Sequence, residues 1–180
     1  LRMSQAYNSK KTVASDETKA SVIAASNAIQ GSQSSEILDL ASTGYLTGAD
    51  LKGDFTTSSK LSDLGITADT SITLTVNGEA KEIALTPDMT INQFTEALKA
   101  EGLNASFDAN NQRFFISSKE SGKAADFELS GDTAALSALG LDYNNAGSEA
   151  VKLPGEDARI LLNNAEFKST SNNFSINGLT

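Results

Sequence analysis

An alternating stretch of residues on both sides of Asn77-Gly78 limits what this chain can fold into more than any other feature. Residues 72–76 (ITLTV) alternate apolar and polar side chains, and Ile83 and Leu85 continue that spacing after the turn. A period of two is typical of a strand with one buried and one wet face. Asn-Gly readily adopts the left-handed backbone angles of a two-residue turn. The stretch therefore predicts a β-hairpin.

A helix is expected directly after this hairpin. Thr86-Pro87-Asp88 interrupts the strand, and residues 90–93 (TINQ) match a capping box, in which the Thr hydroxyl and the Gln side chain each satisfy a free backbone N–H. Gly102 can adopt the left-handed conformation that ends a helix. We therefore predict a helix over residues 91–101. Its apolar face would consist of Ile91, Phe94 and Leu98.

A second hairpin follows, with residues 105–107 and 113–117 as strands around a turn at 108–112. Alternation places Phe114 on the face opposite to Phe115. The order of elements is hairpin, helix, hairpin, short helix. This order predicts an α+β unit that is mostly β. Its remaining elements are a leader turn at 60–66, a strand at 127–129, and a short helix capped by Asp132 and ended by Gly140.

The end of the chain is typical of three short strands. Residues 159–162 and 166–169 flank Asn163-Asn164, and Asn tolerates the backbone angles of a tight turn. Residues 174–176 alternate apolar and polar side chains before a further turn dipeptide, Asn177-Gly178.

The first part of the chain also predicts strands. The Ala content of residues 20–28 would permit a helix, whereas Val22-Ile23 and the flanking Ser residues favour a strand. Leu38 and Leu40 would share one face of the last strand. The expected strands are residues 12–15, 20–25 and 36–41, with a turn at 15–18.

Composition excludes several kinds of chemistry. The chain has no His, Cys or Trp, so imidazole bases, thiolates, Cys/His zinc sites and disulfides are ruled out. We expect no enzymatic activity, no catalytic, cofactor-binding or metal-binding residues, and no cofactor. A net charge of −9 argues against nucleic acid and anionic membranes as partners, because both require a basic surface. No apolar run approaches the roughly 18 residues of a membrane span.

Local structure accounts for the polar motifs that remain. Residues 108–112 (DANNQ) resemble the start of a calcium loop, but Arg113 replaces the turn glycine and no Glu follows at the twelfth position, so a hairpin turn is favoured. Asn104 and Asn173 begin glycosylation sequons, a pattern common by chance. The Ser-rich residues 31–35 lack a base and are expected to form a loop. The carboxylates expected to serve turns and caps are Asp54, Asp63, Asp69, Asp126 and Asp132.

The tail resembles a segment of the bacterial flagellar filament cap family (FliD, hook-associated protein 2). The similar elements are Asp157-Ala158, the Asn163-Asn164-Ala165 turn, Ser169 to Asn172 and Ile176 to Thr180. Residues 11–41 resemble the first strands of the same domain. Residues 55–143 are similar to an insert repeat of flagellar axial proteins, with a Leu-x-x-Leu-Gly leader, a strand into Asn-Gly and Thr-Ile-x-x-Phe.

The resemblance implies two small domains of antiparallel strands. One is discontinuous, formed by residues 11–52 and 153–180, and the other is an inserted head at 55–143 that carries the capped helix on a sheet. Residues 1–10 would be a connector. Because the chain lacks an initiator Met, we expect it to be a piece of a longer protein, whose coiled coils would lie outside it.

The implied function is structural. A filament cap lies at the distal tip of the flagellum, outside the cell, and is exported without a cleaved signal peptide. Its implied partners are further copies of itself in a ring, flagellin, and host mucin or glycan through adhesion. Two alternatives stay open: the outer domain of a flagellin-like filament subunit, and a bacterial surface adhesin built from β-domains.

Overall fold

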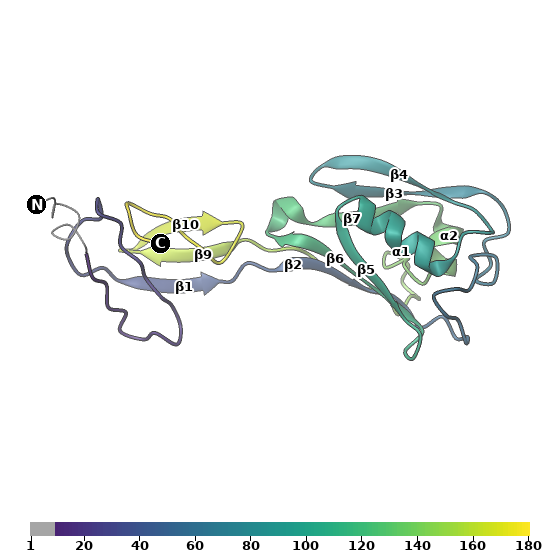
Figure 1. Cartoon of the computed structure of the whole chain (residues 1–180), viewed down its shortest axis with the longest axis horizontal. Helices are drawn as coiled ribbons and strands as arrows, with labels where there is room; N and C mark the ends of the chain where they lie inside the picture. The colour runs from purple at the N-terminus through teal and green to yellow at the C-terminus, as the bar shows by residue number, and fades with distance from the viewer. Residues whose placement is uncertain (1–9) are drawn as a thin grey trace, which may run out of the picture.

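The structure is a computed structural model that describes residues 10–180. The expected connector at residues 1–10 therefore lies almost entirely outside the described residues. The chain forms an elongated molecule with two parts arranged end to end (Figure 1). We call the part that contains residues 35–39 and 158–169 the stem, and the part that contains residues 43–47, 70–138 and 151–153 the head. The expected class, mostly β with antiparallel sheets and two helices, is confirmed.

The first hairpin forms as the alternation predicts. Strands β3 (Thr70–Val76) and β4 (Glu79–Leu85) pair antiparallel, and Asn77 joins them with a φ of 53°. Ile72 and Leu74 are fully buried on one face, as the period of two requires. Strand β7 (Phe127–Gly131) pairs with the other side of β3, which makes β3 the central strand of this sheet.

Helix α1 (Ile91–Ala100) begins and ends close to the predicted residues. The Thr90 hydroxyl accepts the N–H of Gln93 at 3.2 Å, and the Gln93 side chain accepts the N–H of Thr90 at 2.8 Å, so both bonds of the capping box are present. Gly102 follows the helix with a φ of 97°. The predicted apolar face is buried, and Phe94 meets Phe114 of the second hairpin edge to face at 5.5 Å between ring centroids.

The second hairpin is longer than predicted, and its side chains lie on the expected faces. Strand β5 (Leu103–Asp108) pairs with β6 (Arg113–Ser121), with Phe114 buried and Phe115 on the opposite face. Helix α2 (Thr133–Ala138) is capped by Asp132, as expected, and Gly140 follows it with a φ of 66°.

Two strands of the head have no counterpart in the sequence predictions. Strand β2 (Thr43–Thr47) pairs with β6 on one side and with β8 (Val151–Leu153) on the other. The expected boundaries at residues 52 and 153 assign both strands wholly or partly to the discontinuous domain, whereas their pairing places them in the sheet of the head. We propose instead that the head extends over residues 42–156, between the two segments of the stem.

The buried side chains support this division. Leu46 of β2 is fully buried and belongs to the same hydrophobic core as Phe94 and Phe114. That core gathers residues from both sheets and both helices of the head. The few buried apolar residues of the stem lie outside it. They are Ala28, Ala41, Ala158 and Ile160.

The stem joins segments from both ends of the described chain. Strand β9 (Ala158–Leu162) lies between β1 (Ser35–Asp39) and β10 (Ala165–Ser169), with antiparallel pairing on both sides. The turn between β9 and β10 is the predicted one, since Asn163 and Asn164 have φ values of 50° and 66°.

Three of the predicted strands are wrong. Residues 12–15, 20–25 and 174–176 form no regular strand, and the alternative of a helix over 20–28 is not observed. Ile23 instead exchanges two backbone hydrogen bonds with Thr180, at 2.7 and 2.9 Å, beside an isolated bridge between Ala24 and Leu179. Short apolar runs can form such irregular pairings when no neighbouring strand extends them. The two chain segments still lie together, as the tail was expected to return to the first part of its domain.

Candidate interaction surfaces

The candidate carboxylates are distributed over separate turns and caps. Asp63 accepts the backbone N–H of Lys60 at 2.9 Å, and Asp126 pairs with Lys152 at 2.6 Å. Asp54 lies in the loop between β2 and β3, and Asp69 directly precedes β3, so their expected role in turns and caps stays a prediction. Among residues 10–180, no group of three or more acidic side chains is arranged to hold a metal ion.

Asp132 illustrates the local role of these groups. Its carboxylate accepts the Thr70 hydroxyl at 2.6 Å and the N–H groups of Ala134 and Ala135 at 2.9 and 3.2 Å. The Thr70 hydrogen bond, and then those from the backbone, lower the pKa of Asp132 below its ordinary value of 3.8. The carboxylate therefore joins the start of α2 to strand β3.

This lowered pKa predicts a contribution of Asp132 to acid stability. The contribution is present above the ordinary pKa and is lost as the pH falls through the lower pKa of the folded state, because only the folded state favours the charged form. Asp132→Asn keeps a residue suited to helix capping but cannot titrate. We expect its unfolding free energy, measured by urea denaturation between pH 2 and 7, to fall less steeply below pH 4 than that of the parent. Parallel pH curves for the two proteins would contradict this role.

The calcium-like residues 108–112 form a hairpin turn. Asp108 accepts the backbone N–H groups of Asn110 and Asn111 at 2.8 and 3.1 Å, and the side-chain amide of Asn111 at 2.7 Å. These bonds, that of the Asn111 side chain first, lower the pKa of Asp108. The interpretation as a turn between β5 and β6 is confirmed.

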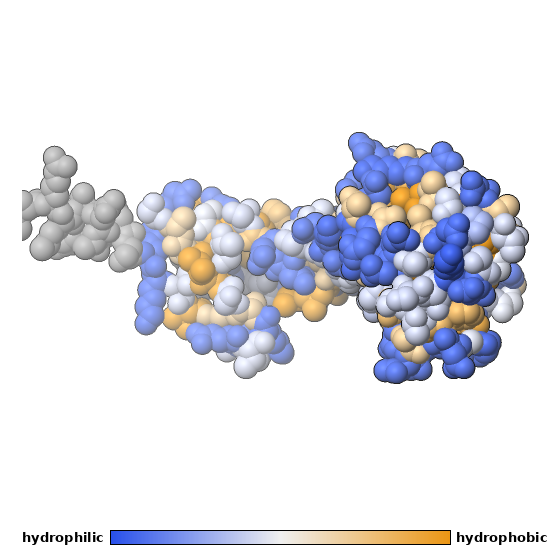
Figure 2. Space-filling view, turned by 45° about the vertical axis from the view of Figure 1, so that its right-hand side comes forward, coloured by the Kyte–Doolittle hydropathy of each residue, from blue (hydrophilic) through white to orange (hydrophobic). Residues whose placement is uncertain are grey.

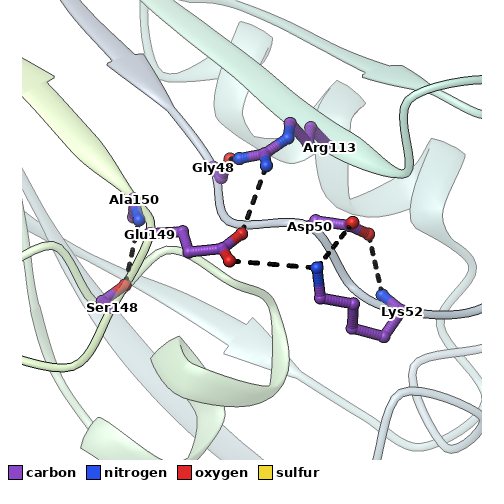
Figure 3. Close-up of polar contacts among 7 residues, drawn as sticks. All are labelled: Gly48, Asp50, Lys52, Arg113, Ser148, Glu149 and Ala150. Atoms are coloured by element: carbon purple, nitrogen blue, oxygen red, sulfur yellow. Dashed lines mark hydrogen bonds and ion pairs between the residues drawn. The ribbon is translucent and has the colours of Figure 1, made fainter.

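A cluster of charged side chains joins three segments near this turn (Figure 3). Arg113 donates to the carbonyl of Gly48 at 2.8 Å and pairs with Glu149 at 3.2 Å. Lys52 lies 2.9 Å from Asp50 and 3.8 Å from Glu149. The hydrogen bond between the Lys52 and Asp50 side chains raises the pKa of Lys52 and lowers that of Asp50. Because opposite charges pair within the cluster, its arrangement suits holding loops together rather than catalysis.

An apolar surface covers part of the outer face of the four-stranded sheet β5-β6-β2-β8 of the head. Tyr45, Val151 and Leu153 are 38%, 54% and 58% exposed. The register places Leu153 opposite Tyr45, while Thr47 lies between Val151 and Phe115. All these side chains point away from the core, because the alternate residues of β2 and β6 are buried. We call Tyr45, Phe115, Val151 and Leu153 the apolar head face.

A second apolar surface lies on the stem. Ile37, Leu38 and Leu40 are 43%, 37% and 64% exposed, and we call them the apolar stem edge. Strand β1 is an edge strand, so its outer backbone groups have no neighbour in the sheet. Figure 2 shows apolar surface over the stem, at the waist between the two parts and on the head. Clustered exposed apolar side chains are typical of protein–protein interaction surfaces.

Sequence reasoning missed both surfaces. The spacing of Tyr45, Leu46 and Thr47 could have indicated a strand with an apolar outer side, but only the neighbouring β6 and β8 show which side is covered.

The two sequon residues, Asn104 and Asn173, are exposed. The helices among residues 10–180 are all too short or too polar to cross a membrane.

Comparisons with known proteins agree on the fold. No family model matches the sequence, and no curated protein matches it. The chain is similar to the D1-D2-D3 domains of the flagellar cap protein FliD from Escherichia coli, with a TM-score of 0.69 at 22% identity; the match covers 88% of this chain and 49% of the other. The chain thus spans about half the length of that relative.

Two further structures give the same result. The FliD D2-D3 domains from Serratia marcescens match with a TM-score of 0.68 at 22% identity, over 88% of this chain and 89% of the other. FliD (HAP2) from Pseudomonas aeruginosa matches with a TM-score of 0.63 at 18% identity, over 88% and 75%. The resemblance stated from the sequence is confirmed at the level of fold. This chain has the fold of the D2-D3 domains of flagellar cap proteins.

Proposed function

We propose that the chain is the head region of a cap at the distal tip of a bacterial flagellar filament, outside the cell. The observation that carries this proposal is the similarity of the fold, over 88% of the chain, to solved structures of flagellar cap proteins. The role is structural rather than catalytic. Consistent with this, the charged groups described above are engaged in caps, turns and ion pairs.

Self-association follows from the two apolar surfaces. The apolar head face and the apolar stem edge differ in sequence and lie on different parts of the molecule. Contact between two different surfaces of identical subunits is heterologous, and such contacts form a ring where the rotation between copies closes and an open filament where it does not. The net charge of −9 would limit non-specific association elsewhere on the surface. We infer that copies of the protein contact one another head to stem.

Flagellin is the second proposed partner. A ring of heads at the filament tip would form a plate under which newly exported flagellin folds and inserts. Adhesion to host mucin or glycan stays a prediction from the sequence.

A chimera tests the cap proposal. Residues 11–180, stem and head together, would replace the corresponding domains of the Escherichia coli cap protein, and filaments would be counted by electron microscopy together with swimming on soft agar. We expect the chimera to form filaments. The same protein without any head is the negative control, and the native Escherichia coli protein is the positive control. A folded, exported chimera that gives no more filaments than the headless protein would contradict the proposal.

Two matched variants of the chimera test the apolar head face. Leu153→Asp introduces a charge at a side chain that is 58% exposed, so its effect on folding should be small, about 0.5 kcal/mol. Ala84→Asp introduces the same charge at an exposed position of β4 in the other sheet. We expect the first to reduce filament number and the second to leave it unchanged. Equal behaviour of the two variants would remove the apolar head face from the proposed contact.

A further inference from the structure

The junction between the stem and the head consists of two chain crossings that lie side by side (Figure 1). One leads from β1 to β2 and the other from β8 to β9. Ser42 and Glu156 hold them together by two backbone hydrogen bonds, Ser42 N–H to Glu156 at 2.9 Å and Glu156 N–H to Ser42 at 3.1 Å. The Ser42 carbonyl also accepts the N–H of Gly122 at 3.0 Å. Three segments of chain are thus joined at one residue.

Further hydrogen bonds connect the two parts directly on the sides of these crossings. The Ser121 hydroxyl, at the end of β6 in the head, donates to the carbonyl of Thr170 in the stem at 2.7 Å. The Lys123 N–H donates to Asp157 at 2.8 Å. Within the stem, Asn172 of the loop after β10 accepts the N–H of Ala41, just before the first crossing, at 2.7 Å and donates to its carbonyl at 3.3 Å. Bending at the crossings would therefore break bonds between the two parts.

Glycines let the backbones approach closely at the same place. A Cβ added to Gly155 would lie 2.6 Å from the carbonyl oxygen of Gly122 and 3.2 Å from the N of Gly44. A Cβ on Gly122 would lie 2.9 Å from both Asp157 Oδ1 and Thr170 Cβ. Such distances are below van der Waals contact, so only glycine fits without a shift of the backbone. An added Cβ at Gly155 would meet the backbones of Gly122 and Gly44 at once, so three chain segments lie in direct contact there.

A largely covered ion pair supports this contact from the head side. Lys152 Nζ lies 2.6 Å from Asp126 Oδ1 and 4.5 Å from the centre of the Phe127 ring, and the Lys152 side chain is only 11% exposed. A Cβ on Gly44 would collide with the same Asp126 oxygen, at 1.9 Å. The pair thus holds the loop that contains Asp126 against β2 and β8.

We infer that this junction is a rigid coupling, so that the stem and the head move as one body. A hinge needs a few residues that can change φ and ψ without losing packing or hydrogen bonds. Here both crossings are bonded to each other, to the loop after β6 and to the loop after β10. The angle of the head on the stem is therefore built into the chain itself. This inference does not depend on the proposed cap function.

Distance measurements between two spin labels test this coupling. The chain has no cysteine, so Ala84→Cys in the head and Ala165→Cys in the stem, both exposed, provide unique attachment sites. We expect double electron–electron resonance to give a single narrow distance distribution, no wider than for a pair of labels within the head. A broad or multiply peaked distribution in the labelled parent would overturn the rigid coupling.

Gly155→Ala tests the glycine contact within the same labelled protein. Its φ does not require glycine, so the added methyl group acts through space alone, and Gly147→Ala is the matched control because its Cβ would meet only Asn145 Oδ1, at 3.8 Å. We expect Gly155→Ala to shift the distance distribution or widen it about twofold, with Gly147→Ala unchanged. If Gly155→Ala unfolds, Ser121→Ala, which removes the hydrogen bond from the head to the Thr170 carbonyl of the stem, must shift or widen the distance distribution instead. A distribution identical to that of the parent in every folded junction variant would refute the role of this contact.

Discussion

A fragment of residues 55–143 is expected to unfold at a much lower urea concentration than a fragment of residues 42–156. The shorter fragment lacks β2, which lies between β6 and β8 in the sheet of the head. It loses Leu46, a fully buried core residue whose truncation alone would cost about 2–5 kcal/mol. Total stabilities of small domains are about 5–15 kcal/mol. Loss of the whole strand should therefore leave the shorter fragment largely unfolded.

Circular dichroism during urea titration and amide dispersion in two-dimensional NMR spectra measure this difference. The fragment 42–156 with Leu46→Ala separates the contribution of the core side chain from that of the strand, and should lie between the other two. If residues 55–143 alone give dispersed spectra and the same midpoint as residues 42–156, the original sequence-based boundary is right and the boundary at 42 and 156 is wrong.

Phe114→Ala is expected to destabilise the chain by about 3–5 kcal/mol. Phe114 is fully buried, and its ring lies 5.5 Å from that of Phe94 and 4.9 Å from that of Phe107. Removing the ring leaves a cavity between α1 and the second hairpin, and also removes the favourable edge-to-face contact with Phe94. Urea denaturation monitored by circular dichroism gives the unfolding free energy of parent and variant.

Phe115→Ala is the matched control, because it deletes the same side chain one position along the same strand. Phe115 points away from the core and is only half-buried, so we expect a loss of about 1 kcal/mol. Similar losses for the two variants would show that the strand does not separate a buried from an open face, and would contradict the placement of the apolar head face.

The elements that the sequence predicts correctly depend on contacts between near neighbours. Asn77-Gly78 and Asn163-Asn164 adopt positive φ as their residue types indicate, and the capping box at residues 90–93 forms both of its bonds. Alternation in β3 and β6 assigns each side chain to the correct face. These signals act over a few residues, so tertiary structure has little opportunity to override them.

The elements that the sequence misses depend on distant partners. Strand β8 has only three residues, too few to show a pattern of its own, yet each of its residues pairs with a residue of β2. Residues 20–25 have a composition suitable for a strand or a helix, but only the contact of Ile23 with Thr180 is available to them. In each case the outcome depends on which segment lies alongside.

The candidate surfaces follow the same division. From the sequence, the absence of His and Cys excludes whole classes of site, and the scattered carboxylates can be assigned to caps and turns. The apolar head face could not be derived this way, because exposure depends on whether another layer covers the sheet. Nothing in the local pattern of Tyr45 or Leu153 distinguishes a covered face from an open one.

The amino-acid sequence was thus sufficient for the hairpins and the capped helices, since turn dipeptides, caps and periodicity act locally. The return of the tail to the first part of the chain was implied by the family resemblance alone. Only the folded chain revealed the extent of the head, the two apolar surfaces and the glycine contact between the head and the stem. These features require backbones more than 30 residues apart in sequence to meet, as Gly155 meets Gly122. Such meetings are set by the packing of the whole molecule rather than by the preferences of any one segment.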